Sequence, residues 1–332
     1  MKIGVIGLGY WGPNLVRNLS SLKEPVGVVC CDLNNARLNL MKKKFPQAET
    51  TEDYLSLLKD PDVEGVCICT PVSLHYKLAK EALLAGKHVL VEKPMTDSSK
   101  DAASLMELAE QKNLILMVDH TFLYTGAVRK IKELISQDEI GSIMYFDSVR
   151  LNLGLFQHDV NVIWDLAPHD LSIMNYIVNE KPVSVSACGS RHFNGKEDMA
   201  YITVKFESNL LAHFHVNWLS PVKVRTILIG GDKKMIVYND MESSEKIKIY
   251  NKGVDVQNEE MRHQLLVHYR NGDMYSPNLE QTEALALLCE DFIDCIMHNK
   301  KPLSDGASGY EIVRIIEASQ QSLALSRPIY LQ

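Results

Sequence analysis

Asp165 and His169 are spaced for acid–base chemistry. They stand four residues apart in the stretch WDLAPHD, and on a helix this spacing places both side chains on one face. A histidine with a pKa near its ordinary value of about 6.5 can take the proton of a hydroxyl group, and a neighbouring carboxylate can orient the ring and stabilise the imidazolium. An isolated pair of this kind also fits a helix start with a capping aspartate, so its meaning depends on the other motifs.

A glycine-rich loop follows the first apolar run of the chain. Gly7, Gly9 and Gly12 form the pattern G-x-G-x-x-G between a predicted strand over 1–6 and a predicted helix over 12–22. In such a loop the first glycine permits a tight turn and the second lets the backbone approach a pyrophosphate, while the third lets helix and strand pack closely. The loop therefore predicts a dinucleotide-binding site.

Asp32 stands where the second strand of such a fold ends. It follows the apolar run 26–31, about 20 residues beyond the glycine loop. A carboxylate here can accept hydrogen bonds from both ribose hydroxyls of NAD, and it repels the 2′-phosphate of NADP. The sequence therefore predicts NAD as the cofactor; the alternative is that Asp32 only caps the next helix. We expect Tyr10 and Trp11 to divide their roles, one lining the cofactor cleft and the other packing in the core.

Glu92 and Lys93 are charged residues at the end of a short apolar strand over 88–91. The carboxyl end of a parallel strand faces the cofactor crevice in this kind of fold. The two residues and Pro94 therefore predict a functional group of side chains at this edge. A solvated strand end is the alternative.

The first 120 residues alternate short β-branched runs with helical patterns. We expect strands at 1–6, 26–31, 63–69, 88–91 and 115–118, and helices at 12–22, 36–45, 73–85 and 97–112. This alternation predicts an α/β fold with a doubly wound parallel sheet, a Rossmann domain, and the nearly all-apolar strands are typical of a sheet covered on both faces.

Longer strands separated by turns follow residue 120. We expect strands at 142–152, 183–192, 200–207, 210–218, 222–229 and 235–239, and helices at 127–137, 280–297 and 308–325. The chain is therefore predicted to divide into an NAD-binding domain (1–120) and an α+β domain with a large open mixed or antiparallel sheet (121–332). Two of its strands carry more apolar residues than one covered face needs, which predicts a homo-oligomer through this sheet.

The composition limits the classes of partner expected for this protein. The chain has 332 residues, 46% of them hydrophobic, and a formal net charge of −7 without a basic block, which argues against nucleic acid as its main partner. No apolar run is long enough to cross a membrane or to form a signal-peptide core, so a cytoplasmic location is expected. Seven cysteines without a Cys-x-x-Cys pair predict buried, reduced thiols. No metal site is expected, since His213 and His215 alternate on one strand face without a third ligand, and we expect them to pair across the sheet.

These motifs together resemble the glucose–fructose oxidoreductase / inositol dehydrogenase (Gfo/Idh/MocA) family. The matching stretches run over essentially the whole chain and read GLGYWG, CTPVSLHY, AGKHVLVEKPM, VDHTFLY, EIGSI, WDLAPHDLSIMNY and DFIDCIMHNKKPLSDG. The resemblance implies an enzyme that passes a hydride from an alcohol to the nicotinamide of NAD. It also implies a homodimer or homotetramer.

The resemblance also implies roles for individual residues. Lys93 is expected between nicotinamide and substrate, bonded to the reacting hydroxyl, with Glu92 near the nicotinamide ribose and a cis peptide bond before Pro94. Lys93, Asp165 and His169 are then catalytic, and the proton acceptor is either Lys93 or His169. The cofactor-binding residues are expected to be Gly7, Gly9, Tyr10, Trp11, Gly12, Asp32, Thr70, Pro71, His75, Glu92, Lys93 and His120. The substrate-binding residues are expected to be Lys93, Arg150, Asn152, Asp165 and His169.

The stretch 150–177 resembles family members of bacterial surface-polysaccharide and lipid A pathways. Such enzymes oxidise the C3 hydroxyl of a nucleotide-activated sugar, UDP-N-acetylglucosamine or its uronic acid, to the 3-keto sugar. We therefore expect a nucleotide-sugar substrate, held by local cationic groups and helix N-termini in spite of the negative net charge. A dehydrogenase of a free sugar, sugar phosphate or cyclitol is the first alternative, and a non-catalytic NAD-binding regulatory protein is the second.

Overall fold

The chain forms two compact units. The computed structural model describes residues 1–154, 160–193, 195–255 and 268–331. The first unit comprises Met1–Thr125 and Thr282–Arg314, and the second comprises Gly126–Gln281 and Ile315–Gln332. The sequence predicted one boundary near residue 120. The structure instead divides the chain after Thr125 and assigns the segment 282–314 to the first unit.

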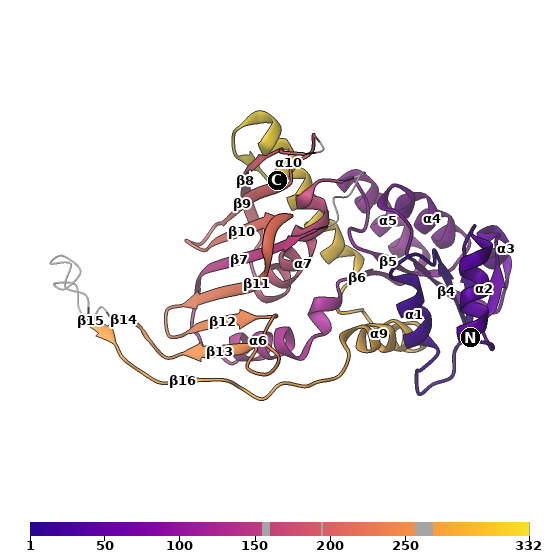
Figure 1. Cartoon of the computed structure of the whole chain (residues 1–332), viewed down its shortest axis with the longest axis horizontal. Coiled ribbons are helices and arrows are strands. Elements are labelled where there is room, and N and C mark those ends of the chain that lie inside the picture. Colours follow the sequence, from indigo (N-terminus) through magenta and orange to yellow (C-terminus); the bar gives the residue numbers. More distant parts are fainter. Residues whose placement is uncertain (155–159, 194, 256–267, 332) are drawn as a thin grey trace. The chain divides into compact units, whose positions relative to one another are not determined.

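The first unit is built on a six-stranded parallel sheet in the order β3-β2-β1-β4-β5-β6 (Figure 1). Its strands are β1 (Lys2–Ile6), β2 (Gly27–Cys31), β3 (Glu49–Thr51), β4 (Val63–Ile68), β5 (His88–Glu92) and β6 (Leu116–Asp119). The predicted doubly wound sheet is thereby confirmed. The strand order reverses between β1 and β4, and α/β folds bind their ligands at such a switch point, outside the carboxyl ends of the strands.

Helices cover both faces of this sheet. They are α1 (Gly12–Leu19), α2 (Asn35–Lys44), α3 (Tyr54–Lys59), α4 (Val72–Leu84), α5 (Ser99–Lys112), the 3₁₀ helix η1 (Thr121–Tyr124) and α9 (Ala284–His298). A side chain on Gly4 would meet Leu57 of α3, whereas one on Gly65 would meet Phe292 of α9. Strands β1 and β4 pair Ile3 with Gly65, so these two residues face the same side of the sheet. Gly4 follows Ile3 directly in β1 and therefore faces the other side. The apolar side of α9 therefore covers this sheet, which explains why residues so far along the chain belong to the first unit.

The second unit contains a nine-stranded sheet in the order β16-β13-β12-β11-β7-β10-β9-β8-β17. Its strands are β7 (Ile143–Leu153), β8 (Pro182–Ser190), β9 (Met199–Phe206), β10 (Leu211–Asn217), β11 (Leu219–Gly231), β12 (Met235–Asn239), β13 (Ile247–Tyr250), β16 (Met274–Tyr275) and β17 (Ile329–Tyr330). Strands β7 and β10 run parallel, and every other neighbouring pair is antiparallel. The predicted mixed sheet is confirmed. Strands β14 (Gly253–Asp255) and β15 (His268–Arg270) form a separate pair.

Helix α7 (Val162–Ile177) packs against β7, β9 and β10 on one face of the large sheet, and α6 (Gly126–Ser136) packs against α7 (Figure 1). Phe146 of β7 and Phe214 of β10 are fully buried, with ring centroids 5.5 Å apart. Helix α10 (Gly306–Leu325) contributes to both units, which divide after Arg314. Across the described ranges, no helix combines the length and the apolar character needed to cross a bilayer.

Candidate active site

The glycine loop joins β1 to α1 in a tight turn. Gly7 has φ +94°, and a Cβ there would lie 2.7 Å from the carbonyl oxygen of Cys69. A Cβ on Gly12 would lie only 2.0 Å from the carbonyl oxygen of Gly7, so the third glycine lets the helix begin against the turn. Gly9 differs, because none of the described residues comes within 4 Å of a Cβ placed on it. The loop thus leaves open space beside its second glycine, where a pyrophosphate is expected to approach.

Asp32 ties the end of β2 to this loop. One carboxylate oxygen accepts the backbone N–H of Leu8 at 2.7 Å, and the other accepts that of Asn34 at 2.8 Å. Arg37 reaches the same carboxylate at 3.3 Å, with about half of its side chain exposed. Asn34, rather than Asp32, caps α2 by accepting the N–H groups of Ala36 and Arg37. The alternative role of Asp32 as a mere helix cap is therefore wrong.

Tyr10 and Trp11 are both exposed on the loop. Their exposed fractions are 81% and 42%, and their rings meet edge to face with centroids 5.3 Å apart. The expectation that one of them packs in the core is wrong, because Gly12 starts the helix one residue later and turns both rings outward. Two exposed aromatic rings beside the open space at Gly9 can contact a bound nucleotide.

His75 links the ends of β4 and β5. Its ring nitrogens lie 2.8 Å from the carbonyl oxygen of Thr70 and 2.9 Å from that of Pro94, and the ring is buried. Burial lowers the pKa of His75, while both carbonyl contacts oppose that shift. The Lys93–Pro94 peptide bond is cis, as the family resemblance implied. His75, which was expected to bind the cofactor, therefore connects the backbone after β4, at Thr70, to the backbone after β5, at Pro94.

Several buried polar atoms gather at the carboxyl ends of β4, β5 and β6. Within the described part of the chain, the Thr70 hydroxyl, Oε1 of Glu92 and both ring nitrogens of His120 have no hydrogen-bond partner. Burial, helped by the charge of Lys93, lowers the pKa of His120 to about 3, so its ring is neutral at physiological pH. Buried polar groups normally find partners, so such a group of atoms is typical of a ligand site.

These features fit a dinucleotide. The open space at Gly9 suits a pyrophosphate, the carboxylate of Asp32 suits ribose hydroxyls, and the polar atoms at the strand ends suit the nicotinamide end. All three lie along the carboxyl edge of one parallel sheet, where the fold predicts the cofactor.

Helix α7 carries Asp165 and His169. Asn161 caps it by accepting the N–H groups of Ile163 and Trp164, at 3.2 and 3.3 Å. One turn later, Asp165 accepts the indole N–H of Trp218 at 3.0 Å. A buried indole N–H normally needs a partner, and here that partner is the predicted catalytic carboxylate. Trp218 was missed in the sequence because 53 residues separate it from Asp165.

Asn152 lies near the same tryptophan. A Cβ placed on Gly154 would be 3.0 Å from the Asn152 amide nitrogen and 2.8 Å from the Trp218 ring, so both side chains approach this glycine. The structure thus brings together Asn152, Trp218 and Asp165. Asn152 and Asp165 were both predicted to bind substrate.

Arg150 is placed differently. Its guanidinium donates to both carboxylate oxygens of Asp170, at 2.9 and 2.6 Å, and both side chains are almost fully buried. Ser148 donates to the same carboxylate at 2.7 Å. Burial disfavours the charged guanidinium, but Asp170 more than offsets this and raises the pKa of Arg150. The predicted substrate ligand therefore joins β7 to α7.

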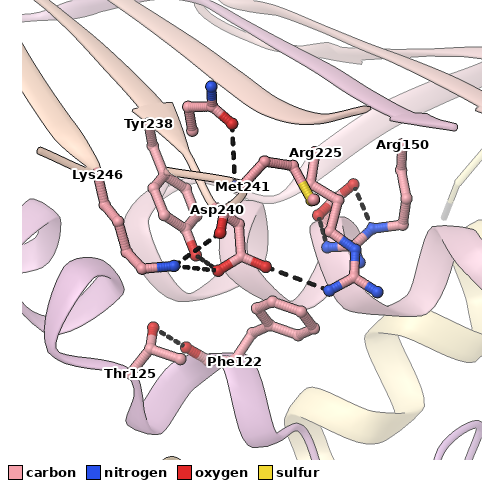
Figure 2. A network of polar contacts seen from close by, with 10 residues as sticks. Phe122, Thr125, Arg150, Arg225, Tyr238, Asp240, Met241 and Lys246 are labelled. Atoms are coloured by element: carbon pink, nitrogen blue, oxygen red, sulfur yellow. Dashed lines mark hydrogen bonds and ion pairs between the residues drawn. The ribbon is translucent and has the colours of Figure 1, made fainter. Parts of the chain in front are cut away.

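A second ion cluster lies beside Arg150, whose partner across β7 and β11 is Arg225. Figure 2 shows Arg225 reaching Asp240, with Lys246 and Tyr238 on the same carboxylate, at 3.2, 3.0 and 3.3 Å. Burial alone would raise the pKa of Asp240, but Lys246 and Arg225 lower it below its ordinary value. The helix-covered face of the sheet thus holds charged groups in defined pairs.

His213 and His215 lie on the opposite face of the sheet, as cross-strand neighbours of β9. The His213 ring meets the Thr203 hydroxyl at 3.2 Å, and the His215 ring stacks on Tyr201 with centroids 4.3 Å apart. No group of residues suited to hold a metal ion occurs in the described ranges. The cross-strand pairing of these histidines is confirmed.

The cysteines are free thiols. Five of the seven are buried, and burial raises the pKa of Cys30 to about 11, so it stays protonated. Cys188 is exposed, which differs from the expected burial because it lies on the open part of β8.

A cavity of about 490 Å³ lies beside α6 in the second unit. Its lining includes Arg129, Lys132, Tyr176 and Glu280. Arg129 pairs with Glu280 at 2.9 Å, and Lys132 donates to the Tyr176 carbonyl at 2.8 Å. The lining contains none of the residues predicted for catalysis or binding.

Several known dehydrogenases are similar to this chain. UDP-N-acetylglucosamine 3-dehydrogenase of Acidithiobacillus ferrooxidans is 25% identical over 321 residues, which cover 94% of each chain. Myo-inositol 2-dehydrogenase of Thermotoga maritima is 28% identical over 222 residues, covering 64% of this chain and 66% of the relative. The solved structure of a levoglucosan dehydrogenase in complex with NADH and levoglucosan has the same fold, with a TM-score of 0.84, 21% identity and 99% coverage of both chains.

Two family models match nearly the whole chain. The model described as "Oxidoreductase family, NAD-binding Rossmann fold" matches residues 1–120, and that described as "Oxidoreductase family, C-terminal alpha/beta domain" matches residues 132–331. The first match identifies residues 1–120 as an NAD-binding domain. The chain therefore belongs to the Gfo/Idh/MocA family of oxidoreductases, whose characterised relatives above are sugar and cyclitol dehydrogenases.

Proposed function

We propose that this enzyme oxidises the C3 hydroxyl of a nucleotide-activated sugar, UDP-N-acetylglucosamine or its uronic acid, to the 3-keto sugar, in surface polysaccharide or lipopolysaccharide biosynthesis. The observation that carries the proposal is the similarity to a UDP-N-acetylglucosamine 3-dehydrogenase over nearly the full length of both chains. The joint occurrence of Lys93, Asp165 and His169 in the sequence supports a dehydrogenase that acts on an alcohol.

The proposed chemistry divides between a cation and a base. Bound NAD supplies the acceptor for the hydride. A cis peptide bond joins Lys93 to Pro94, and the His75 ring contacts the Pro94 carbonyl oxygen. Lys93 stabilises negative charge on the substrate oxygen. Either Lys93 or His169 takes the hydroxyl proton, and Asp165, oriented by the Trp218 indole, steadies the positive form of His169.

A dehydrogenase of a free sugar, sugar phosphate or cyclitol is the competing proposal. It is favoured by the myo-inositol 2-dehydrogenase relative. The two proposals differ in whether the site accepts a uridine diphosphate group.

Thermal-shift titration separates these substrates, since a ligand that binds only the folded protein raises the melting temperature by mass action. With NAD present, we expect UDP-N-acetylglucosamine or its uronic acid to raise the midpoint at concentrations where myo-inositol and free glucose do not. UDP alone serves as the control for the nucleotide part. Stabilisation by polyols and none by any UDP-sugar would support the competing proposal.

We also propose that the enzyme is a homodimer or homotetramer that associates through the open face of the large sheet. Alternation along the strands turns Val149, Tyr201, Leu228 and Val237 to the face opposite α7. These side chains are only half-buried in a single chain. A broad sheet face of this kind favours association with a second copy.

A further inference from the structure

Two buried carboxyl groups meet at the ends of β5 and β6. Glu92 and Asp119 are the last residues of these strands and are direct register partners. Their exposed fractions are 8% and 3%, so two acidic side chains are buried next to each other. Two ionised carboxylates in one buried site repel each other, and a single proton on one of the acids removes this repulsion and lets that acid donate a hydrogen bond to the other.

The surroundings decide which acid holds that proton. Asp119 accepts the hydroxyl and the backbone N–H of Thr121, and both donors stabilise its ionised form. Oε1 of Glu92 has no partner among the described residues. Burial and the charge of Asp119 raise the pKa of Glu92 well above its ordinary value, and Lys93 opposes this shift without overcoming it. The proton therefore belongs to Glu92, which donates it to Asp119.

This placement determines the charge at the ends of β5 and β6. With Glu92 protonated, the single negative charge rests on Asp119 against Thr121, one strand away. The ionisable groups that face Glu92 in the described structure are Lys93, Asp119, the neutral His120 and the protonated thiols of Cys67 and Cys69.

We propose that Asp119 is a positioning residue that holds Glu92 in its neutral form, so that Glu92 offers an uncharged acceptor to the nicotinamide half of NAD. The donors that the Glu92 acceptor fits are a ribose hydroxyl or the carboxamide of nicotinamide. Nothing in the proposal requires a particular sugar.

Infrared difference spectroscopy of the cofactor-free protein at pH 7 tests the proton directly. We expect a protonated-carboxyl C=O band that is lost in Glu92→Gln. It is also lost in Asp119→Asn, because the new amide donates to Glu92 and stabilises its ionised form. Asp62→Asn, at an exposed position before β4, keeps the band. If Glu92→Gln leaves the wild-type spectrum unchanged, the proposal is overturned. Glu92→Gln is isosteric, so it provides the test on its own if Asp119→Asn does not fold.

Binding of the two cofactor forms gives a second readout. An ionised Glu92 attracts the positive nicotinamide of NAD⁺ but not the neutral ring of NADH. Asp119→Asn is therefore expected to raise the ratio Kd(NADH)/Kd(NAD⁺) by about tenfold, equivalent to about 1.4 kcal/mol. The double variant Glu92→Gln/Asp119→Asn should lose this increase, since no charge remains on residue 92. Equal ratios in the single and double variants would contradict the proposal.

Both readouts are made without sugar, so they hold or fail independently of the substrate. Failure of the proposed function appears instead as no NADH formation from UDP-sugars while the infrared band and the affinity ratio behave as expected.

Discussion

At the scale of single residues, Asp32 both organises the glycine loop and restrains Arg37. Asp32→Asn keeps an acceptor oxygen for only one of the N–H groups of Leu8 and Asn34, which bond to different carboxylate oxygens, and it removes the charge that repels a 2′-phosphate. Arg37, about half exposed, is then available to that phosphate. We expect the affinity for NADPH relative to NADH to rise about tenfold, since a charge-assisted hydrogen bond contributes about 1.5–3 kcal/mol. Fluorescence titration with both cofactors measures it, and an unchanged ratio would show that Asp32 does not select NAD.

Trp218 donates its indole N–H to Asp165 and is predicted to influence the proposed reaction through this carboxylate. Trp218→Phe keeps most of the buried apolar volume but removes the indole N–H that Asp165 accepts. Because this hydrogen bond orients the carboxylate rather than binding substrate, kcat is expected to fall about tenfold with KM changed less than threefold. Steady-state kinetics, with melting curves to confirm folding, give the result. A rise in KM at constant kcat would instead indicate a role in substrate binding.

His120 makes stability depend on pH. Its pKa is about 3 in the folded protein and about 6.5 in the unfolded chain, so the unfolded state binds the additional proton between these values. The stabilising contribution of the neutral ring is therefore complete above about pH 6.5 and is lost as the pH falls toward 3. Between pH 7 and pH 5 the wild type should lose about 2 kcal/mol more unfolding free energy than His120→Leu. Parallel pH dependences in urea unfolding would exclude this titration.

At the scale of elements, Asn161 caps the start of α7, the helix that carries Asp165 and His169. Asn161 supplies the acceptor for two N–H groups of the first turn, and its amide also donates to Glu197 and Gln320 at 2.7 Å each. Asn161→Ala should lower the free energy of unfolding by about 1 kcal/mol, and Asn161→Ser should recover much of this because serine also caps helices. Thermal or urea unfolding measures both. Equal losses would assign the contribution to the Glu197 and Gln320 contacts instead.

Periodic apolar runs predicted most elements of both units, because buried strands and amphipathic helices repeat their apolar residues at fixed intervals. Short elements were not predicted: β3 has three residues and α3 has six, too few for a period to appear. The packing of α9 on the first sheet was not predicted either, since it depends on contacts with residues more than 200 positions away.

The candidate site was predicted unevenly for the same physical reason. The glycine loop, Asp32 and the Glu92–Pro94 stretch carry local signals, namely chain reversal and charge at a strand end. Asp119 and Trp218 carry none, because their importance comes from neighbours across the sheet that only the fold brings together. Arg150 shows the converse, since this charged residue was predicted to bind substrate and instead forms a two-point ion pair with the buried Asp170.

At the scale of the whole molecule, the open sheet face leads to a prediction about assembly. Leu228→Glu places a charge near the centre of that face and should shift a dimer or tetramer toward monomer, because a buried unpaired charge is costly. Met297→Glu, at an exposed position of α9, is the matched control. Light scattering at micromolar concentration measures the mass. A monomeric wild type would refute the proposed association.

Lys93 and His169 are proposed to handle the hydroxyl proton of an activated sugar. The most direct test of these roles is the rate of NADH formation with UDP-N-acetylglucosamine or its uronic acid, followed by absorbance, in the wild type and in Lys93→Ala and His169→Ala proteins that melt normally. The wild type should turn over. Lys93→Ala should lose about 10²–10³-fold in rate, the range known for an electrostatic stabiliser, and His169→Ala about 10²–10⁴-fold, the range known for a proton-transferring group. Near wild-type turnover by both variants would contradict the proposed roles.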